Sequence, residues 1–185
     1  AKSATGRLHA LYTLAQLDAL DDATLLPMLQ DPEAGVRRHA LRLAEPTLEK
    51  GADILDVVLA MTDDVDALVR LQLALTLGET QDPRALTALA DLAERYGSER
   101  WMADAILSSV SAQAQLLAAE LLARDEFAGE DKIFGRLAAS VGARRDSSEV
   151  NRFLAMIAGI DVDAHPQRQI VLLEAFVASL ADGHQ

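Results

Sequence analysis

The sequence contains no cysteine. This absence excludes disulfide bonds, thiolate metal sites, a cysteine nucleophile and covalent c-type haem attachment within the chain. Aromatic residues make up only 4% of the 185 residues and β-branched residues are scarce, so a sheet-based fold is not expected. No apolar run approaches the roughly 18 residues of a membrane-spanning helix. We therefore expect no direct insertion into a membrane.

The residues that are abundant favour helices. Alanine and leucine together supply about a third of the chain, and both are strong helix formers. With 29 acidic against 17 basic residues, the net charge is −12, so we expect neither nucleic acid nor an anionic membrane surface as the main partner. Arginine outnumbers lysine by 14 to 3, which is typical of proteins from GC-rich bacteria.

A repeated pattern runs through the first 110 residues. The triplet His-Ala-Leu occurs at residues 9–11 and again 30 residues later, at 39–41. The pair Val-Arg occurs at 36–37 and again 33 residues later, at 69–70, and residues 98–107 form a degenerate fourth copy. Shorter amphipathic segments lie between the copies, at Asp22–Leu29, 52–61 and Pro83–Tyr96. This predicts a helix-turn-helix unit repeated every thirty-odd residues.

Turn residues mark the boundaries of these helices. Aspartate is a good N-cap and proline is tolerated in a first helical turn, and such residues recur at Asp31-Pro32, Asp63-Asp64 and Asp82-Pro83. Glycines at expected helix ends are Gly51, Gly97, Gly129 and Gly142. Further helices are predicted over 111–124, 132–141, 149–160 and 166–181, with Ser147 or Ser148 capping the third of them.

The Val-Arg pair with a preceding aspartate resembles HEAT repeats, whose second helix carries Asp-x-x-x-Val-Arg-x-x-Ala. Asp31 precedes Val36-Arg37 by four intervening residues, and Asp64 precedes Val69-Arg70 in the same way. The resemblance implies an all-α, right-handed α-α superhelix of about five helix pairs with a ragged first unit. It implies one array over 1–185, regular over 1–125 and divergent over 126–185. It also implies a structural ladder in which the side chains of successive repeats interlock, formed by Asp31, Arg37, Asp64 and Arg70.

A narrower resemblance involves residues 8–14, 36–45, 69–79, 106–109 and 141–144. These segments are similar to the HEAT region of the large haem-binding, membrane-bound-dehydrogenase-like proteins of planctomycetes. In that family a β-propeller precedes the HEAT region, and a cytochrome c domain with Cys-x-x-Cys-His follows it. The resemblance implies an exported, extracytoplasmic bacterial redox protein of which this chain is one segment. The chain begins at Ala1 rather than at a methionine, in keeping with that expectation.

The helix expected around residues 69–77 is apolar on nearly all sides. A helix that buries one face needs only one apolar stripe, so all-round apolarity predicts cover on both sides. Leu71 and Leu75 fall outside the expected core positions, and Tyr12 and Leu41 are expected near them. We predict that these four residues line an apolar groove for a protein partner or a neighbouring domain. The alternative is that the helix array curves more tightly, so that later helices of the same chain cover the groove.

Trp101 is the only tryptophan. It is expected either to pack between repeats or to anchor a binding partner. With Asp104 on the same helix face it is reminiscent of HEAT-like DNA-alkylation glycosylases, but those enzymes need basic surfaces, which a net charge of −12 opposes. A bilin-lyase-like protein that binds a tetrapyrrole is a second ligand-binding alternative.

No recognised catalytic or cofactor motif is present. The sequence has no nucleophile elbow, phosphate loop or dinucleotide fingerprint. His9 and His39 occupy equivalent repeat positions, but no third ligand is spaced to complete a metal site. The acidic cluster Asp63, Asp64 and Asp66 lacks the pattern of a calcium loop and is better explained as helix capping. We therefore expect a non-catalytic interaction scaffold or spacer with no cofactor and no metal.

Overall fold

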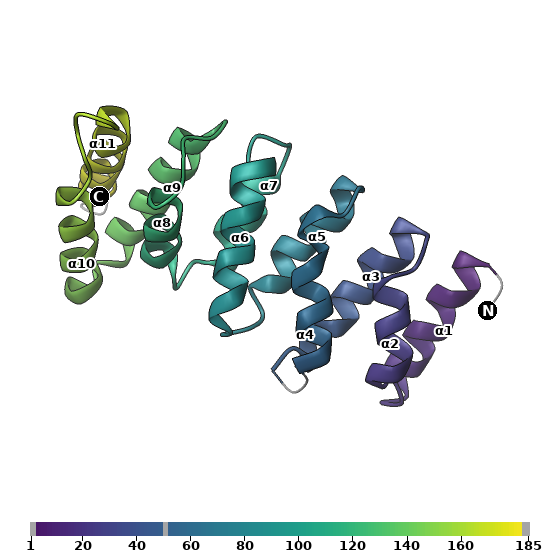
Figure 1. Cartoon of the computed structure of the whole chain (residues 1–185). Coiled ribbons are helices and arrows are strands. Elements are labelled where there is room, and N and C mark those ends of the chain that lie inside the picture. Colours follow the sequence, from purple (N-terminus) through teal and green to yellow (C-terminus); the bar gives the residue numbers. More distant parts are fainter. Residues whose placement is uncertain (1–2, 50–51, 183–185) are drawn as a thin grey trace. The chain divides into compact units, whose positions relative to one another are not determined.

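The computed structural model describes residues 3–49 and 52–182, and every regular element in these residues is helical (Figure 1). The α-helices are α1 (Ala4–Gln16), α2 (Asp22–Leu29), α3 (Ala34–Ala44), α4 (Ala52–Leu59), α5 (Ala67–Leu77), α6 (Pro83–Tyr96), α7 (Met102–Ser109), α8 (Ala114–Leu122), α9 (Glu130–Arg144), α10 (Ser147–Ala158) and α11 (Pro166–Asp182). Short 3₁₀ helices occupy Glu45–Thr47 and Ala60–Asp63. The predicted all-α, α-solenoid fold class is confirmed, and α2 and α6 have the bounds that the sequence predicted.

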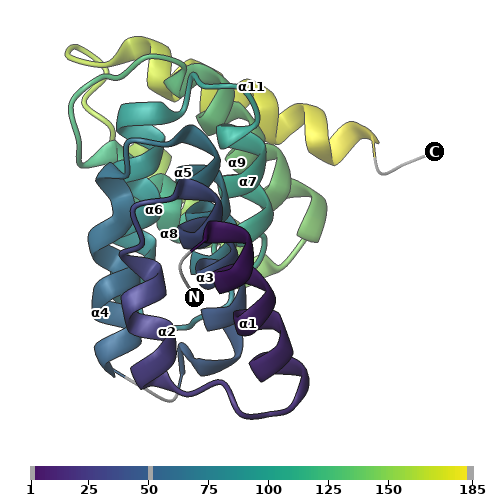
Figure 2. The ribbon, with the colours of Figure 1, turned by 90° about the vertical axis from the view of Figure 1, so that its right-hand side faces the viewer.

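The chain forms two compact units, an N-terminal unit of residues 1–88 and a C-terminal unit of residues 89–185. In the N-terminal unit, helices alternate between two layers. α1 packs against α3 and α3 against α5, while α2 packs against α4. Figure 2 shows α2 and α4 on one side of this unit and α1 on the other. The helices α1, α3 and α5, which carry the repeated Arg motifs, therefore form one continuous layer.

The core of the N-terminal unit lies between these two layers. Its side chains recur at helical spacing, so that each helix places a single stripe against the opposite layer. The buried members include Leu11, Leu25, Leu29, Val36, Leu41, Ile54, Val58, Val69 and Leu73. The two layers are held chiefly by aliphatic packing, since the few aromatic side chains of the molecule contribute little here.

In the C-terminal unit, α9 and α11 pack closely along their lengths. Gly142 lies inside α9, so its predicted place at a helix end is wrong. A Cβ at this position would lie 3.1 Å from the Phe176 carbonyl oxygen and 3.2 Å from Ser179 Cβ of α11. The glycine therefore permits the close approach of two helices. Gly97 follows α6 and Gly129 precedes α9, whereas Gly51 lies outside the described residues.

Buried polar contacts also join elements of the C-terminal unit. Arg168 of α11 is fully buried and donates through Nε and Nη2 to the two carboxylate oxygens of Glu130, at 3.0 and 2.8 Å. Its Nη1 donates to the Arg124 carbonyl oxygen at 3.0 Å. The hydrogen bonds to Glu130, opposed in part by burial, raise the pKa of Arg168. The guanidinium also lies 5.6 Å from the Phe134 ring centroid. Each of the three guanidinium nitrogens of this buried cation thus donates a hydrogen bond.

Helix starts follow the capping rules, with one correction. Asp21 accepts a hydrogen bond from the Thr24 amide, and Asp66 accepts from the amides of Leu68 and Val69. α10 is capped by Asp146, whose Oδ1 accepts from the Glu149 amide at 2.8 Å, so the predicted caps Ser147 and Ser148 are wrong. A carboxylate accepts more strongly than a hydroxyl at the positive end of a helix.

α7 begins later than the repeat pattern suggests. The fourth copy was expected from residue 98, but the helix starts at Met102 because Trp101 has a left-handed backbone with φ of 70°. A left-handed residue cannot continue a right-handed helix. No helix in the described part of the chain is long and apolar enough to cross a membrane.

Candidate interaction surface

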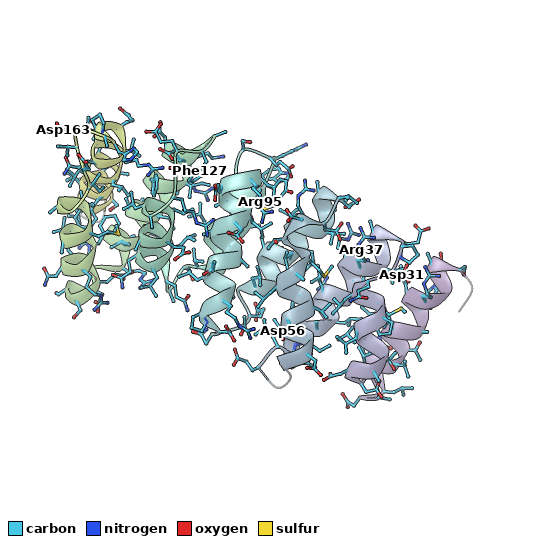
Figure 3. The ribbon with its side chains drawn as sticks, in the orientation of Figure 1. Asp31, Arg37, Asp56, Arg95, Phe127 and Asp163 are labelled. Carbon is cyan, nitrogen blue, oxygen red and sulfur yellow. The ribbon has the colours of Figure 1, made fainter. Side chains whose placement is uncertain are left out.

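The layer of α1, α3 and α5 places matching residues at matching sites. With the repeat spacings of 30 and 33 residues, Arg7, Arg37 and Arg70 are equivalent, and Asp31 is equivalent to Asp64. The arginines lie on the helices of this layer, while each aspartate lies just before the next helix of the layer. Figure 3 labels Asp31 and Arg37, which lie near each other where α2 leads into α3.

Arg7 of α1 binds Asp31 through two parallel hydrogen bonds. Nε donates to Oδ2 at 2.5 Å and Nη2 donates to Oδ1 at 2.7 Å. The same carboxylate also accepts the Glu33 amide at 2.9 Å. The Asp31 side chain is almost completely buried. The hydrogen bonds from Arg7, which outweigh the effect of burial, lower the pKa of Asp31.

Arg37 of α3 repeats this arrangement one unit further on. Nε donates to Asp64 Oδ2 at 2.6 Å and Nη2 donates to Oδ1 at 2.7 Å. Nη1 donates to the Asp31 carbonyl oxygen at 2.9 Å, so one guanidinium joins the turns before α3 and α5. The side chains of Arg37 and Asp64 are only 12% and 7% exposed. Burial acts to raise the pKa of Asp64, but the hydrogen bonds from Arg37 and the Asp66 amide leave that pKa lowered.

Arg70 of α5 makes the third matching contact. Its Nη1 donates to the Asp64 carbonyl oxygen at 2.7 Å, just as Arg37 donates to that of Asp31. Hydrogen bonds therefore link successive members of one series, in the order Arg7, Asp31, Arg37, Asp64 and Arg70. Sequence analysis did not include Arg7, although the His-Ala-Leu triplet aligns it with Arg37.

The outward face of this layer is defined by four equivalent positions on each helix. These are Thr5, Leu8, His9 and Tyr12 on α1, Gly35, Arg38, His39 and Arg42 on α3, and Leu68, Leu71, Gln72 and Leu75 on α5. All twelve residues are at least partly exposed. Leu68 and Leu75 are 54% and 40% exposed, and Leu71 is half-buried between them. We call this set the α1–α3–α5 face.

Leu41 does not belong to the α1–α3–α5 face. Its side chain is fully buried, so it cannot take part in a surface groove as the sequence analysis expected. Leu41 lies on the core side of α3, at the position equivalent to those of Leu11 and Ala74, which are both core residues. One helical position away, Arg42 is exposed and equivalent to Leu75. Leu68, which the sequence analysis omitted, is instead the most exposed apolar residue of this face.

Tyr12 and His39 join α1 to α3 at this surface. The Tyr12 hydroxyl lies 2.7 Å from His39 Nδ1, and the two rings meet edge to face with centroids 5.5 Å apart. Burial lowers the pKa of His39, with Arg38 and Arg42 contributing in the same direction. The neutral imidazole is therefore the form that this contact favours. The half-buried Tyr12 ring presents a fixed edge at the border of the face.

A polar cluster at the same surface joins the end of α3 to α5. Thr76 Oγ1 donates to Glu45 Oε1 at 3.0 Å, and Gln72 Nε2 contacts the same oxygen at 3.2 Å. Burial raises the pKa of Glu45, and the Thr76 hydrogen bond opposes this only in part. Thr76 itself has no exposed surface. These contacts join the end of α3 to α5 beside the core stripe that α5 buries.

Trp101 is a separate exposed feature of the C-terminal unit. Its side chain is 57% exposed, which shows that it does not fill a core between repeats. The Arg100 guanidinium lies 5.0 Å from the ring centroid, within cation–π distance. Asp104 is engaged by Arg136, whose Nη1 donates to Oδ1 at 2.5 Å. The pair of Trp101 and Asp104 therefore does not form an aromatic and free carboxylate site of the glycosylase kind.

The described residues do not bring together the ligands of a metal centre. No cluster of three or more histidine, aspartate or glutamate side chains could hold a metal ion there. His39 is engaged by Tyr12 and lies on α3, whereas the exposed His9 lies on α1. In the acidic cluster, Asp66 caps α5 and Asp64 binds Arg37.

Residues 23–107 match the family model for HEAT repeats. The matched segment starts within α2 and ends within α7, and it includes the Arg37–Asp64 pair and the leucines of α5. This part of the chain is therefore similar to HEAT repeats. Comparison with curated proteins and with solved structures gives no match. Repeats of this type usually serve as protein-interaction scaffolds and are usually non-catalytic.

Proposed function

We propose that the chain is a non-catalytic scaffold that binds a protein partner, or a neighbouring domain of its own polypeptide, through the α1–α3–α5 face. One observation carries the proposal: Leu68, Leu71 and Leu75 form an apolar stripe on the outward side of α5, although that helix already buries its opposite side. Tyr12 borders the same face on α1. Apolar side chains gathered at one place on a surface favour contact with another protein.

The replacement of Leu71 and Leu75 by serine is expected to weaken partner binding while the fold remains intact. The loss of two apolar anchors from an interface should reduce affinity at least about 10-fold. Peptides selected from a random display library on the immobilised chain serve as the probe, and their dissociation constants are measured by fluorescence anisotropy. Leu116→Ser with Leu154→Ser is the control, since these leucines of the C-terminal unit are 48% and 39% exposed, close to the 54% and 40% of Leu68 and Leu75.

The second variant Leu68→Ser with Leu75→Ser tests the same face with its two exposed leucines, so that unfolding does not confuse the result. Circular dichroism and the melting temperature verify the fold of each variant. Peptides that bind both variants as tightly as the wild type would contradict the proposal. So would a loss of helix signal in Leu71→Ser/Leu75→Ser, because those leucines would then be part of the core.

We also propose two finer features. Trp101 acts as a second partner anchor, which its exposed ring and the adjacent Arg100 support. The chain is an interdomain spacer of a larger exported bacterial redox protein, which the sequence likeness of segments such as 36–45 and 69–79 supports. The coding frame on both sides provides the test. A propeller upstream and Cys-x-x-Cys-His downstream would support the spacer, whereas a start codon directly before Ala1 and a stop codon after Gln185 would contradict it.

A further inference from the structure

We infer that the α1–α3–α5 face recognises an acidic, amphipathic segment of the partner protein, in which carboxylates lie between apolar anchors. The inference rests on the proposed function, because it specifies the chemistry of the partner at the same surface. It goes further because it requires negative charge on the partner, although this protein is itself strongly acidic. Its basis is the way in which charge is distributed between the two layers of the N-terminal unit.

The layer of α1, α3 and α5 contains no aspartate or glutamate within its helices. Residues Ala4–Gln16, Ala34–Ala44 and Ala67–Leu77 carry only arginine and histidine as ionisable side chains besides Tyr12. The carboxylates of the N-terminal unit lie instead on α2 and α4, in the short 3₁₀ helices and in the connecting turns. Acidic side chains are therefore absent from the three helices of this layer, although the partly buried Glu45, which follows α3, contacts Gln72 of the face and lies near Arg42.

The arginines of this layer differ in whether they form an ion pair. Arg7 and Arg37 are neutralised by Asp31 and Asp64. Arg38 and Arg42 lie on the outward side of α3 and form no ion pair within the described residues. Both also lower the pKa of the half-buried His39 ring, as expected of cations that lie next to it. Two positive charges one helical turn apart thus remain on the surface.

Apolar side chains flank this positive stripe on both sides. On α5, the residues equivalent to Arg38 and Arg42 are Leu71 and Leu75, and on α1 they are Leu8 and Tyr12. Neighbouring helix axes in such a layer lie about 8–10 Å apart. A partner segment that crosses the layer therefore meets an apolar strip, then two guanidinium groups, then a second apolar strip. Carboxylates in the middle and apolar side chains at either end complement that order.

The same surface is poorly suited to nucleic acid. A phosphate backbone would extend beyond the two arginines into the acidic turns that surround the layer, and the charge repulsion would grow with each further phosphate. The flanks are mainly leucine, and their one aromatic ring, Tyr12, already packs edge to face against His39, so the face lacks the series of aromatic rings on which the bases of single-stranded nucleic acids stack. Charge complementarity is confined to a short stretch, as a peptide segment requires.

Reversal of the two charges provides the test. Peptides are selected on the wild-type chain from the random display library, and the most enriched one is synthesised with a fluorescent label. We expect its sequence to contain Asp or Glu between apolar residues, and Arg38→Glu with Arg42→Glu should weaken its binding at least about 10-fold. A peptide with its acidic residues replaced by lysine should then prefer the doubly reversed variant. The control Lys132→Glu with Arg152→Glu changes the net charge equally at exposed sites of the C-terminal unit.

The outcomes separate this inference from the proposed function. The inference is overturned if the selected peptides lack acidic residues or bind the Arg38→Glu/Arg42→Glu variant as tightly as the wild type. If the same peptides no longer bind Leu68→Ser/Leu75→Ser, that result would still support the scaffold. Peptides insensitive to the leucine variants overturn the scaffold instead, and failure to enrich any peptide contradicts both. Binding of a labelled DNA or RNA oligonucleotide that Arg38→Glu/Arg42→Glu abolishes would identify nucleic acid as the ligand and overturn the acidic peptide.

Discussion

Asp64→Ala is expected to lower the free energy of unfolding by about 3 kcal/mol, as is typical when one partner of a buried ion pair is removed. The carboxylate of Asp64 accepts two hydrogen bonds from Arg37 and one from the Asp66 amide. Without it, a guanidinium that is only 12% exposed keeps its charge in a largely buried site. We propose that this pair, with Arg7–Asp31, fixes the register of neighbouring repeats. Urea unfolding followed by circular dichroism measures the effect.

Asp56→Ala is the matched control for this prediction. Asp56 of α4 also forms an ion pair with an arginine of a later helix, because Arg84 Nη1 donates to its Oδ1 at 2.6 Å. Both side chains are more than half exposed, so solvent screens the pair and little change in stability is expected. A similar loss of stability in Asp56→Ala and Asp64→Ala would show that burial of the Arg37–Asp64 pair has no special role.

The contribution of the Asp64 charge is also expected to depend on pH. The pKa of Asp64 is lowered in the folded protein, so its contribution is complete above the ordinary value of 3.8 and is lost as the pH falls through the lowered value. The difference in unfolding free energy between wild type and Asp64→Asn should therefore be constant near neutral pH. It should shrink as the pH falls below about 4. A difference that stays constant down to pH 2 would contradict the assigned role of the charge.

Gly142→Leu is expected to destabilise the C-terminal unit by about 2–3 kcal/mol, the usual effect of overpacking a well-packed contact. A Cβ at Gly142 would overlap Ser179 Oγ and approach the Phe176 carbonyl oxygen to 3.1 Å. The hydroxyl can rotate away, but it already donates to that carbonyl, and the carbonyl is part of the α11 backbone. α9 and α11 must therefore separate to admit the new side chain. The midpoint of urea unfolding measures the loss.

Gly135→Ala in the same helix is the control and is expected to act in the opposite direction. Its Cβ would lie 3.8 Å from Ala175 Cβ and 3.8 Å from Val171 Cγ1, which is ordinary van der Waals contact. Replacement of a helical glycine by alanine at such a site favours the helix by up to about 1 kcal/mol. If Gly135→Ala and Gly142→Leu destabilised the protein equally, close helix approach would not explain Gly142.

Local sequence signals were sufficient to predict the helices. The amphipathic segments and the Asp and Pro residues at their starts located α2 and α6 to the residue, since these signals act within one or two helical turns. The errors arose where two local signals compete. Asp146 and Ser147 are both good caps, and Gly142 is compatible both with a helix end and with a helix interior against a close neighbour. The packing of α9 against α11 decides the second case, and the local hydrogen bond from the Glu149 amide to Asp146 decides the first.

The sequence by itself determined that the chain is helical, that its first part is repetitive, and that arginine and aspartate recur at matching positions. It did not determine which side chains face outward, because that depends on how each helix is rotated in its layer. Leu41 and Arg42 are neighbours, yet the first is in the core and the second is exposed. Arg37 and Arg38 have the same chemistry, but Asp64 neutralises only Arg37. Tertiary structure therefore brings three helices that contain no carboxylate together as one layer of an acidic chain.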